Sequence, residues 1–359
     1  MICCMDCFCD PEIRGTILSL EHKGTCPICG KKDTWIYDSE TDFEKSAFED
    51  LLSSVIQIYK PEEELNPTVP ESGRGELENQ LSKDWKIFAI EPPGIRKIAE
   101  SVIINSLGLD SRLLSQKVGI PELYDENYLE EHSVMGSRQW EDFKFYLRNS
   151  NRFHSRYINL NILKEVLEDT ITTIPRGTRF YRARTAKDAK GYQKGEMGAP
   201  PDDKATPGRA NSKGISCLYL ASKRKTTVKE IRAGAFDYVT VATFKLNRDV
   251  KVVDLSAITH SSPFYAKTDK VKYLLNEMHL RKIENDLAKP VSSRDSDLDY
   301  LPTQYISDFA KLLGYDGVKY ISTFDKESFN LALFHPEVCD CTYKRTFVIG
   351  NLDYKLNAL

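Results

Sequence analysis

Two kinds of hydrophobic pattern divide the chain near residue 172. Before that point apolar residues recur every three or four positions, which is the spacing of one helix face. This spacing predicts helices over Phe43–Tyr59, Leu77–Ile90, Ile95–Leu107, Trp140–Leu147 and Leu160–Ile171. The stretch 61–75, rich in proline, glycine and charge, predicts a linker or an ordered but irregular loop.

After residue 172 the apolar runs are short and rich in β-branched and aromatic residues, which favours strands. We expect them at Thr178–Arg182, Cys217–Ala221, Val239–Phe244, Val250–Asp254, Gly317–Ile321 and Leu331–Phe334. A helix should open at Pro302 and close at Gly314. Because strands and helices do not alternate regularly, the pattern predicts an α+β domain and not a doubly wound sheet.

Cysteines are concentrated at the start of the chain, with six of the nine before residue 30. Cys4-x2-Cys7 and Cys26-x2-Cys29 are separated by eighteen residues, the spacing of two knuckles that hold one tetrahedral zinc ion. Four protein thiolates would close the site, so the predicted zinc is structural. Cys3 or Cys9 could replace one of these four cysteines as a zinc ligand, and His22 is a weaker candidate for the same role. The remaining three cysteines, Cys217, Cys339 and Cys341, are interpreted as structural.

Bulk composition narrows the function classes. The chain has 359 residues, of which 41% are hydrophobic and 29% charged, and no apolar run is long enough to span a bilayer. The start of the chain lacks a secretory signal pattern, so we expect a cytoplasmic protein. A net charge of -3 argues against nucleic-acid binding through the overall charge of the protein. The six histidines form no pairing typical of a catalytic metal site.

Three polar residues stand at element ends in the second half: Arg182 in Phe180–Arg184, Tyr219 in an apolar strand, and Glu230 in Thr226–Arg232. In isolation each has an ordinary structural interpretation, as a surface ion pair, a core tyrosine or a solvated glutamate. Their order resembles the RES domain over residues 176–334. That family folds like the ADP-ribosyltransferases and cleaves NAD.

The resemblance implies roles for these residues. Arg182 would bind the diphosphate, Tyr219 would line the NAD pocket, and Glu230 would contact the ribose and offset positive charge at its anomeric carbon. Ser322, with Thr323 as a residue that could share its role, matches the family serine, and Asn330 matches a hydrogen-bonding residue of the pocket. Within the long loop 185–213, expected to act as a lid, Arg209 either contacts phosphate or pins the loop.

The first half has a resemblance of its own. A zinc ribbon carrying Cys4-x2-Cys7-Phe8, followed by helices, resembles the HEPN/RES N-terminal domain that precedes RES domains. We therefore expect a zinc ribbon at 1–38, a helical HEPN-like domain at 39–171 and a RES domain at 172–359. The RES domain would have an ADP-ribosyltransferase-like mixed β core. Arg148-x5-His154 also has the spacing of HEPN ribonucleases.

Taken together, the resemblance implies a toxin or defence effector that depletes NAD as a glycohydrolase or phosphorylase. The first alternative is a mono-ADP-ribosyltransferase with a protein or nucleotide target. The second alternative is a non-catalytic binding module or a HEPN-type ribonuclease. Partners implied are NAD and an antitoxin or regulatory protein. The acceptor, the identity of the antitoxin and the formation of a homo-oligomer are left open.

Overall fold

The computed structural model describes residues 1–42, 47–106, 108–256, 262–264, 269–289 and 297–350. The chain forms two compact units, the first made of Met1–Ser137 with His260–Met278 and the second of Arg138–Thr259 with His279–Leu359. Parts of three predicted segments lie outside the described residues: 43–46 in the first helix, 107 at the end of the helix expected over Ile95–Leu107, and 257–261, 265–268, 290–296 and 351–359 in the RES domain.

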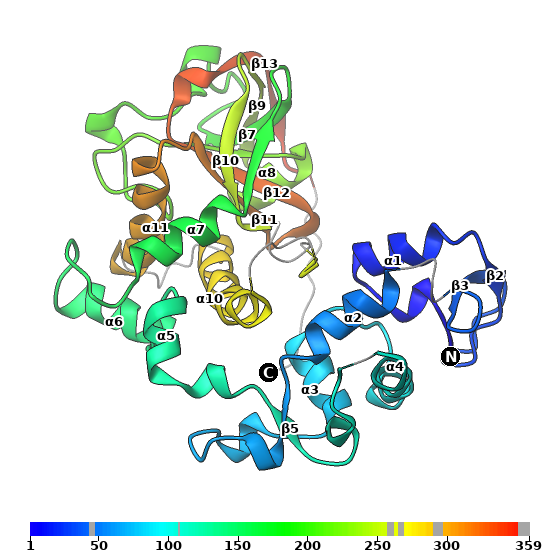
Figure 1. The fold of residues 1–359 in the computed structure, drawn as a ribbon. Helices are drawn as coiled ribbons and strands as arrows, with labels where there is room; N and C mark the ends of the chain where they lie inside the picture. Colours follow the sequence, from blue (N-terminus) through cyan, green and yellow to red (C-terminus); the bar gives the residue numbers. More distant parts are fainter. Residues whose placement is uncertain (43–46, 107, 257–261, 265–268, 290–296, 351–359) are drawn as a thin grey trace. The chain divides into compact units, whose positions relative to one another are not determined.

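The first unit is built from a small sheet and a group of helices (Figure 1). Its three-stranded sheet has the order β1-β3-β2, with β1 (Ile2–Cys4), β2 (Lys23–Gly24) and β3 (Thr34–Asp38). The helices are α1 (Pro11–Leu18), α2 (Phe48–Ile56), α3 (Leu77–Asp84), α4 (Pro92–Asn105) and α5 (Glu126–His132). The side chain of Asp10 caps α1 by accepting from the backbone of Glu12 and Ile13.

One hydrophobic core runs through this unit. Phe48 on α2 stacks on Tyr37 of β3, with ring centroids 4.3 Å apart, and meets Phe8 edge-on at 5.6 Å. The irregular stretch after α2 is an ordered loop, containing β4 (Lys60–Pro61) paired with β5 (Val118–Gly119) and two short 3-10 turns (Glu62–Glu64, Glu71–Gly73).

The second unit is organised around an eight-stranded mixed sheet of order β13-β9-β7-β8-β12-β11-β10-β6. Its strands are β6 (Ile171–Ile174), β7 (Arg179–Ala186), β8 (Leu218–Ala221), β9 (Tyr238–Leu246), β10 (Val250–Asp254), β11 (Gly317–Ser322), β12 (Asp325–Leu333) and β13 (Cys339–Val348). Only the β10–β11 pair is parallel, and the other neighbours are antiparallel. At Gly317 a Cβ atom would lie 2.3 Å from the carbonyl oxygen of Ala332, so the β11–β12 approach requires glycine.

The helices of this unit are α6 (Trp140–Asn149), α7 (Leu160–Glu168), α8 (Arg224–Glu230) and α11 (Leu301–Leu312), together with the second half of α10 (Lys270–Ala288). Helix α8 packs on β7, β8 and β9, whereas α11 packs on β11 and α6. Gly314 has a positive φ of 85° just after α11, as expected for a helix end closed by glycine.

The sheet and helices confirm the α+β class. Each strand expected from the sequence is found, although β12 starts six residues earlier, at Asp325, than the predicted Leu331. Strands β6 and β13 and helix α10 were not predicted. The contacts group α6 and α7 with the sheet, while the expected boundaries after residues 38 and 171 stay a proposal.

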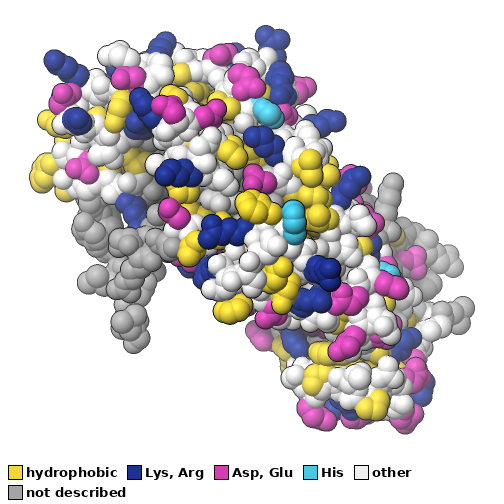
Figure 2. Space-filling view, turned by 90° about the vertical axis from the view of Figure 1, so that its left-hand side faces the viewer, with side chains coloured by type: hydrophobic (Ala, Val, Ile, Leu, Met, Phe, Trp, Pro, Cys, Tyr) yellow, Lys and Arg dark blue, Asp and Glu magenta, His cyan; other side chains and the backbone are white. Residues whose placement is uncertain are grey.

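One face of the surface carries charges of both signs without segregation. On the face in Figure 2, acidic and basic side chains are interspersed and hydrophobic side chains form small groups between them. No helix in the described part of the chain combines the length and the apolar character needed to cross a membrane.

Candidate active site

A cavity of about 310 Å³ opens in the second unit. Strands β7, β8, β11 and β12, helix α8, the loop before β8 and the end of α10 supply its walls. The residues that line it are Arg182, Ala183, Gly208, Arg209, Tyr219, Leu220, Ala221, Thr227, Glu230, Ile231, Arg232, Leu287, Ala288, Lys289, Tyr320, Phe324 and Asn330. Five of the six predicted site residues of this half therefore line one cavity, and the sixth, Ser322, bonds to one of them.

Arg182 is a largely buried cation in the wall of this cavity. Its Nη1 atom is shielded from solvent and has no hydrogen-bond partner among the residues that the structure describes. Burial, with the neighbouring Arg184 guanidinium adding repulsion, lowers the pKa of Arg182 to about 10. A buried cation with an unpaired donor is costly, so this site is prepared for an anion that the protein itself does not supply.

Arg184 lies two residues along on the same face of β7 and behaves differently. Its guanidinium donates to the carbonyl oxygen of Glu196 and lies 4.1 Å from the ring centroid of Tyr192. The loop after β7 thus satisfies Arg184 and leaves Arg182 for the cavity.

Glu230, the last residue of α8, is held by two donors from the sheet. Ser322 Oγ donates to its Oε1 at 2.7 Å, and Asn330 Nδ2 donates to the same oxygen at 2.8 Å. Oε2 has no hydrogen-bond partner in the described part of the chain. The carboxylate is therefore fixed in direction, with one oxygen left for a ligand.

Local structure explains why these three side chains meet. Asn330 lies in β12 opposite Ala221 of β8, and Ser322 ends β11 at an irregularity in the strand register. The Ser322 hydroxyl also accepts from the backbone of Phe324 at 3.3 Å, which fixes its donor direction toward Glu230. Thr323 is exposed, so the geometry favours Ser322 for the role that the sequence left to either residue.

Tyr219 also lines the cavity, but its hydroxyl is engaged by the protein. It donates to Asn211 Oδ1 at 2.8 Å and accepts from the backbone of Ala210 at 2.9 Å. Burial, together with the nearby Cys217 thiol, raises the pKa of Tyr219 well above its usual value, so the phenol stays protonated. The ring is presented to the cavity while the oxygen organises the preceding loop.

Arg209 is buried and anchored at the same loop. Its Nη1 donates to the carbonyl oxygen of Asp286 at 2.9 Å, and its guanidinium lies 5.0 Å from the ring centroid of Tyr300. These contacts favour pinning of the loop, one of the two roles considered from the sequence, which stays a prediction. The guanidinium also lines the cavity, so contact with a phosphate stays a proposal.

Three further residues of the cavity were not picked out from the sequence. Tyr320 shares a face of β11 with Ser322, and this alternation was a usable signal. Burial and the Glu230 carboxylate raise the pKa of Tyr320, so it too stays protonated. Arg232 and Lys289 are exposed residues at the ends of α8 and α10, and nothing in their local sequence marks them.

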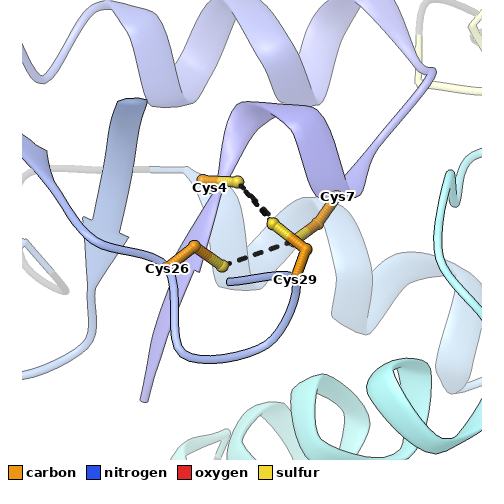
Figure 3. Close-up of side chains that lie close together, drawn as sticks. All are labelled: Cys4, Cys7, Cys26 and Cys29. Carbon is orange, nitrogen blue, oxygen red and sulfur yellow. Dashed lines mark hydrogen bonds between the residues drawn. The ribbon is translucent and has the colours of Figure 1, made fainter. Parts of the chain in front are cut away.

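A second polar cluster lies in the first unit, where Cys4, Cys7, Cys26 and Cys29 converge (Figure 3). The Sγ atoms are 3.7 Å apart for Cys4 and Cys7, 3.4 Å for Cys4 and Cys29, and 3.6 Å for Cys7 and Cys26. Sulfurs bound to one tetrahedral zinc at about 2.3 Å would be separated by about 3.8 Å. The cluster therefore fits a zinc ion without rearrangement of the backbone.

The turns around the cluster are built for this convergence. The backbone of Cys26 donates to Lys31 O at 2.8 Å, that of Gly30 donates to Cys26 O at 2.9 Å, and Gly30 has a φ of 76°. Two of the three alternative ligands make other contacts: the Cys9 thiol donates to Lys86 O at 2.9 Å, and His22 pairs with Asp42 at 3.2 Å.

Arg148 and His154, the pair with HEPN-like spacing, are held by separate contacts. Arg148 Nη2 pairs with Asp299 Oδ1 at 2.5 Å. His154 is exposed, and its backbone N–H donates to Asn151 Oδ1 at 3.0 Å. Arg148 is thus engaged in an ion pair, and the backbone of His154 is engaged in a turn.

Comparisons with known proteins place the cavity in context. Residues 179–354 match the family model of the RES domain, whereas no curated protein matches the chain. Among solved structures, the chain is similar to one in the M. tuberculosis MbcT-MbcA toxin-antitoxin complex, with 16% identity, 52% of this chain and 92% of that chain covered, and a TM-score of 0.33. The family match spans every strand from β7 to β13 and all the candidate cavity residues described above from Arg182 to Asn330. The C-terminal half of the chain is therefore a RES domain.

Proposed function

We propose that the protein is an enzyme that cleaves the bond between nicotinamide and ribose in NAD, as a glycohydrolase or phosphorylase. The observation that carries the proposal is a pair of complementary charges in one cavity. The Arg182 guanidinium has an unpaired buried donor, and Glu230 is a carboxylate fixed by Ser322 and Asn330 with one free oxygen.

Departure of nicotinamide leaves positive charge on the anomeric carbon and the ring oxygen of the ribose. A carboxylate whose direction is already set by two hydrogen bonds stabilises that charge without reorganising during the reaction. Glu230 Oε2 is the atom that we assign to this task, through the ribose hydroxyls or the ring itself. Ser322 and Asn330 keep Oε1 occupied and so orient the carboxylate.

The remaining charges support an anionic substrate. Arg182, Arg209, Arg232 and Lys289 line the cavity with one carboxylate, Glu230, among them. Four cations against one anion favour a diphosphate, and a guanidinium presents parallel donors to phosphate oxygens. At about 310 Å³ the cavity is at the small end of ligand pockets, so it would enclose the reacting half of NAD more closely than the adenosine.

The group that accepts the ADP-ribose distinguishes a glycohydrolase or phosphorylase from a mono-ADP-ribosyltransferase. Water, phosphate and a protein side chain can all attack the same anomeric carbon, so a mono-ADP-ribosyltransferase would need the same Arg182, Tyr219 and Glu230. A non-catalytic binding module would have no use for a fixed carboxylate beside an unpaired arginine. A ribonuclease at Arg148 and His154 is disfavoured by the ion pair of Arg148 with Asp299.

Two further assignments belong to the same proposal. The four cysteines of the first unit would hold one structural zinc ion and so stabilise the fold around them. The similar solved chain comes from a toxin-antitoxin complex, and we propose by analogy that this protein also acts as a toxin or defence effector in the cytoplasm under control of a partner protein.

Mass spectrometry of products is the direct test. The purified protein is incubated with NAD, with and without phosphate, and beside the Glu230→Gln variant, which should form product far more slowly. ADP-ribose indicates hydrolysis, ADP-ribose 1-phosphate indicates phosphorolysis, and a mass increase on a protein indicates transfer. Intact NAD under all conditions, with correctly folded protein, would reject the proposal.

Expression in a bacterial host separates the two candidate sites. Growth arrest with loss of cellular NAD should be relieved by Glu230→Ala and unaffected by His154→Ala. Relief by His154→Ala at unchanged NAD would move the activity to the ribonuclease-like pair.

A further inference from the structure

The turn Gly208–Asn211 belongs to the loop before β8 and carries two residues that line the cavity. Its ends are joined by backbone bonds, from Gly208 N to Asn211 O at 2.9 Å and from Asn211 N to Gly208 O at 3.5 Å. Gly208 and Arg209 line the cavity, so the position of the turn sets part of the cavity wall.

One side of the turn is held by Tyr219. Its hydroxyl bonds both to the backbone of Ala210 and to the side chain of Asn211, at 2.9 and 2.8 Å. The approach is close enough to exclude a side chain at the first position, because a Cβ on Gly208 would lie 2.6 Å from the Tyr219 hydroxyl. Asn211 continues the contact by donating to the carbonyl oxygens of Thr206 and Ile215, at 3.0 and 2.9 Å.

The other side is held by Gln304 on helix α11. Its Nε2 donates to Gly208 O and to Asn211 O, each at 2.8 Å, and these are the two carbonyls that close the turn. Because both partners are carbonyl oxygens, only the amide NH₂ can face them. Gln304 and Asn211 are 5% and 4% exposed, so neither bond is open to replacement by bulk water.

We propose that Gln304, Asn211 and the Tyr219 hydroxyl form a latch that holds the Gly208–Asn211 turn against the cavity, and that they act as positioning residues for the bound nucleotide. This proposal rests on the proposed function for its substrate. Gln304 and Asn211 do not line the cavity and act only through the turn. The phenol of Tyr219 therefore serves the site by placing the turn and Arg209, whereas its ring faces the ligand.

Two readouts test the latch, and one of them does not depend on NAD. Trypsin cleaves after arginine, and Arg209 sits buried in the middle of the turn. Gln304→Met and Tyr219→Phe each remove hydrogen bonds to the turn while keeping a side chain of similar size. Cleavage after Arg209 should become about tenfold faster in each variant, because the loss of these buried hydrogen bonds makes local opening of the turn easier. The Michaelis constant for NAD should rise by a similar factor of about ten, with a smaller change in kcat.

Coupling between the two sides sharpens the test. If both side chains hold one turn, the double variant should show little more effect than the stronger single variant, because the turn is already released. Tyr305→Phe is the matched control, since Tyr305 neighbours Gln304 on α11 and its ring packs on Phe143. This control should leave both readouts unchanged, and thermal unfolding confirms that all variants are folded.

The outcomes are distinct. Wild-type rates of cleavage after Arg209 in Gln304→Met overturn the latch, as do fully additive effects in the double variant. Faster cleavage at an unchanged Michaelis constant also overturns it, since the turn would then have no positioning role. If the wild-type protein leaves NAD intact while both variants open the turn, the latch is supported and the proposed function fails.

Discussion

The cysteine cluster and the RES-domain cavity are both groups of buried polar side chains, yet they are satisfied in opposite ways. In the cluster four thiols face one another, with Sγ atoms 3.4 to 3.7 Å apart in the pairs Cys4–Cys7, Cys4–Cys29 and Cys7–Cys26, and one cation would complete them. In the cavity Arg182 keeps an unpaired buried donor, and Glu230 keeps one oxygen without a partner. The first arrangement is closed around an ion, whereas the second stays open to a larger ligand.

This contrast indicates different functions for the two groups. A site whose ligand atoms all come from the protein contributes folding energy, and it has no position left for a substrate. A site that leaves a buried charge uncompensated loses stability and gains affinity for a complementary ligand.

The largest effect is expected from the cluster. Cys26→Ser should abolish binding of one zinc ion per chain and expose amides of residues 1–42 to hydrogen exchange, because structural zinc contributes on the order of 10 kcal/mol to such folds. The RES domain should keep its protection. Elemental analysis and exchange mass spectrometry measure both quantities.

Cys9→Ser is the matched control for this substitution. Its thiol donates to the backbone of Lys86 and lies outside the cluster, so the variant should retain one zinc. Absence of zinc from wild-type protein purified without chelator would remove the closed side of the comparison.

The second effect concerns turnover. Glu230→Gln keeps the size of the side chain and removes its charge, so kcat should fall by roughly 10²-fold while the Michaelis constant changes little. Quantification of nicotinamide release measures this. Glu327→Gln, on an exposed part of β12, should behave as the wild type; an unchanged kcat in Glu230→Gln would show that its carboxylate has no part in the reaction.

The two sites also differ in how far the sequence revealed them. The cysteine spacing is local, so the four ligands follow from the two turns alone, and the structure brings those four together. The cavity is assembled from segments between residues 182 and 330, and only a family resemblance linked Arg182, Tyr219 and Glu230 in advance.

The residues and the strand that could not be predicted from the sequence each have a physical reason. Arg232 and Lys289 reach the cavity because helices α8 and α10 end there, and helix ends are placed by tertiary packing. Gln304 is one of several buried polar residues on α11, and its two carbonyl partners lie more than ninety positions away. Strand β13 carries mixed polar and apolar residues because it is an edge strand paired only with β9, so its pattern was weak.

The third effect separates two neighbouring arginines. Arg182→Ala should raise the Michaelis constant for NAD by about tenfold to a hundredfold, because a charge-assisted contact to phosphate is worth roughly 1.5–3 kcal/mol. Arg184→Ala should change it far less, since that guanidinium is already engaged by Glu196 and Tyr192. Isothermal titration in the Glu230→Gln background, where turnover is slow, gives the matching affinities for NAD. Equal losses in the two variants would show general charge attraction and not a specific site.

The smallest effect concerns stability and has the opposite sign to most buried substitutions. Burial lowers the pKa of Arg182 to about 10, so the protonated side chain disfavours the folded state at neutral pH. This cost stays constant below the lowered pKa and declines only as pH rises above about 10. Arg182→Met should therefore raise the free energy of unfolding of the RES domain by on the order of 1 kcal/mol at pH 7, while NAD binding is lost. Trp140 belongs to the second unit, which contains the RES domain, whereas Trp35 and Trp85 belong to the first. Replacing those two by phenylalanine therefore leaves a fluorescence probe of the second unit in denaturant titrations. A destabilised Arg182→Met variant would mean that Arg182 is held by the fold itself, and the cavity would then resemble the cysteine cluster in being satisfied from within.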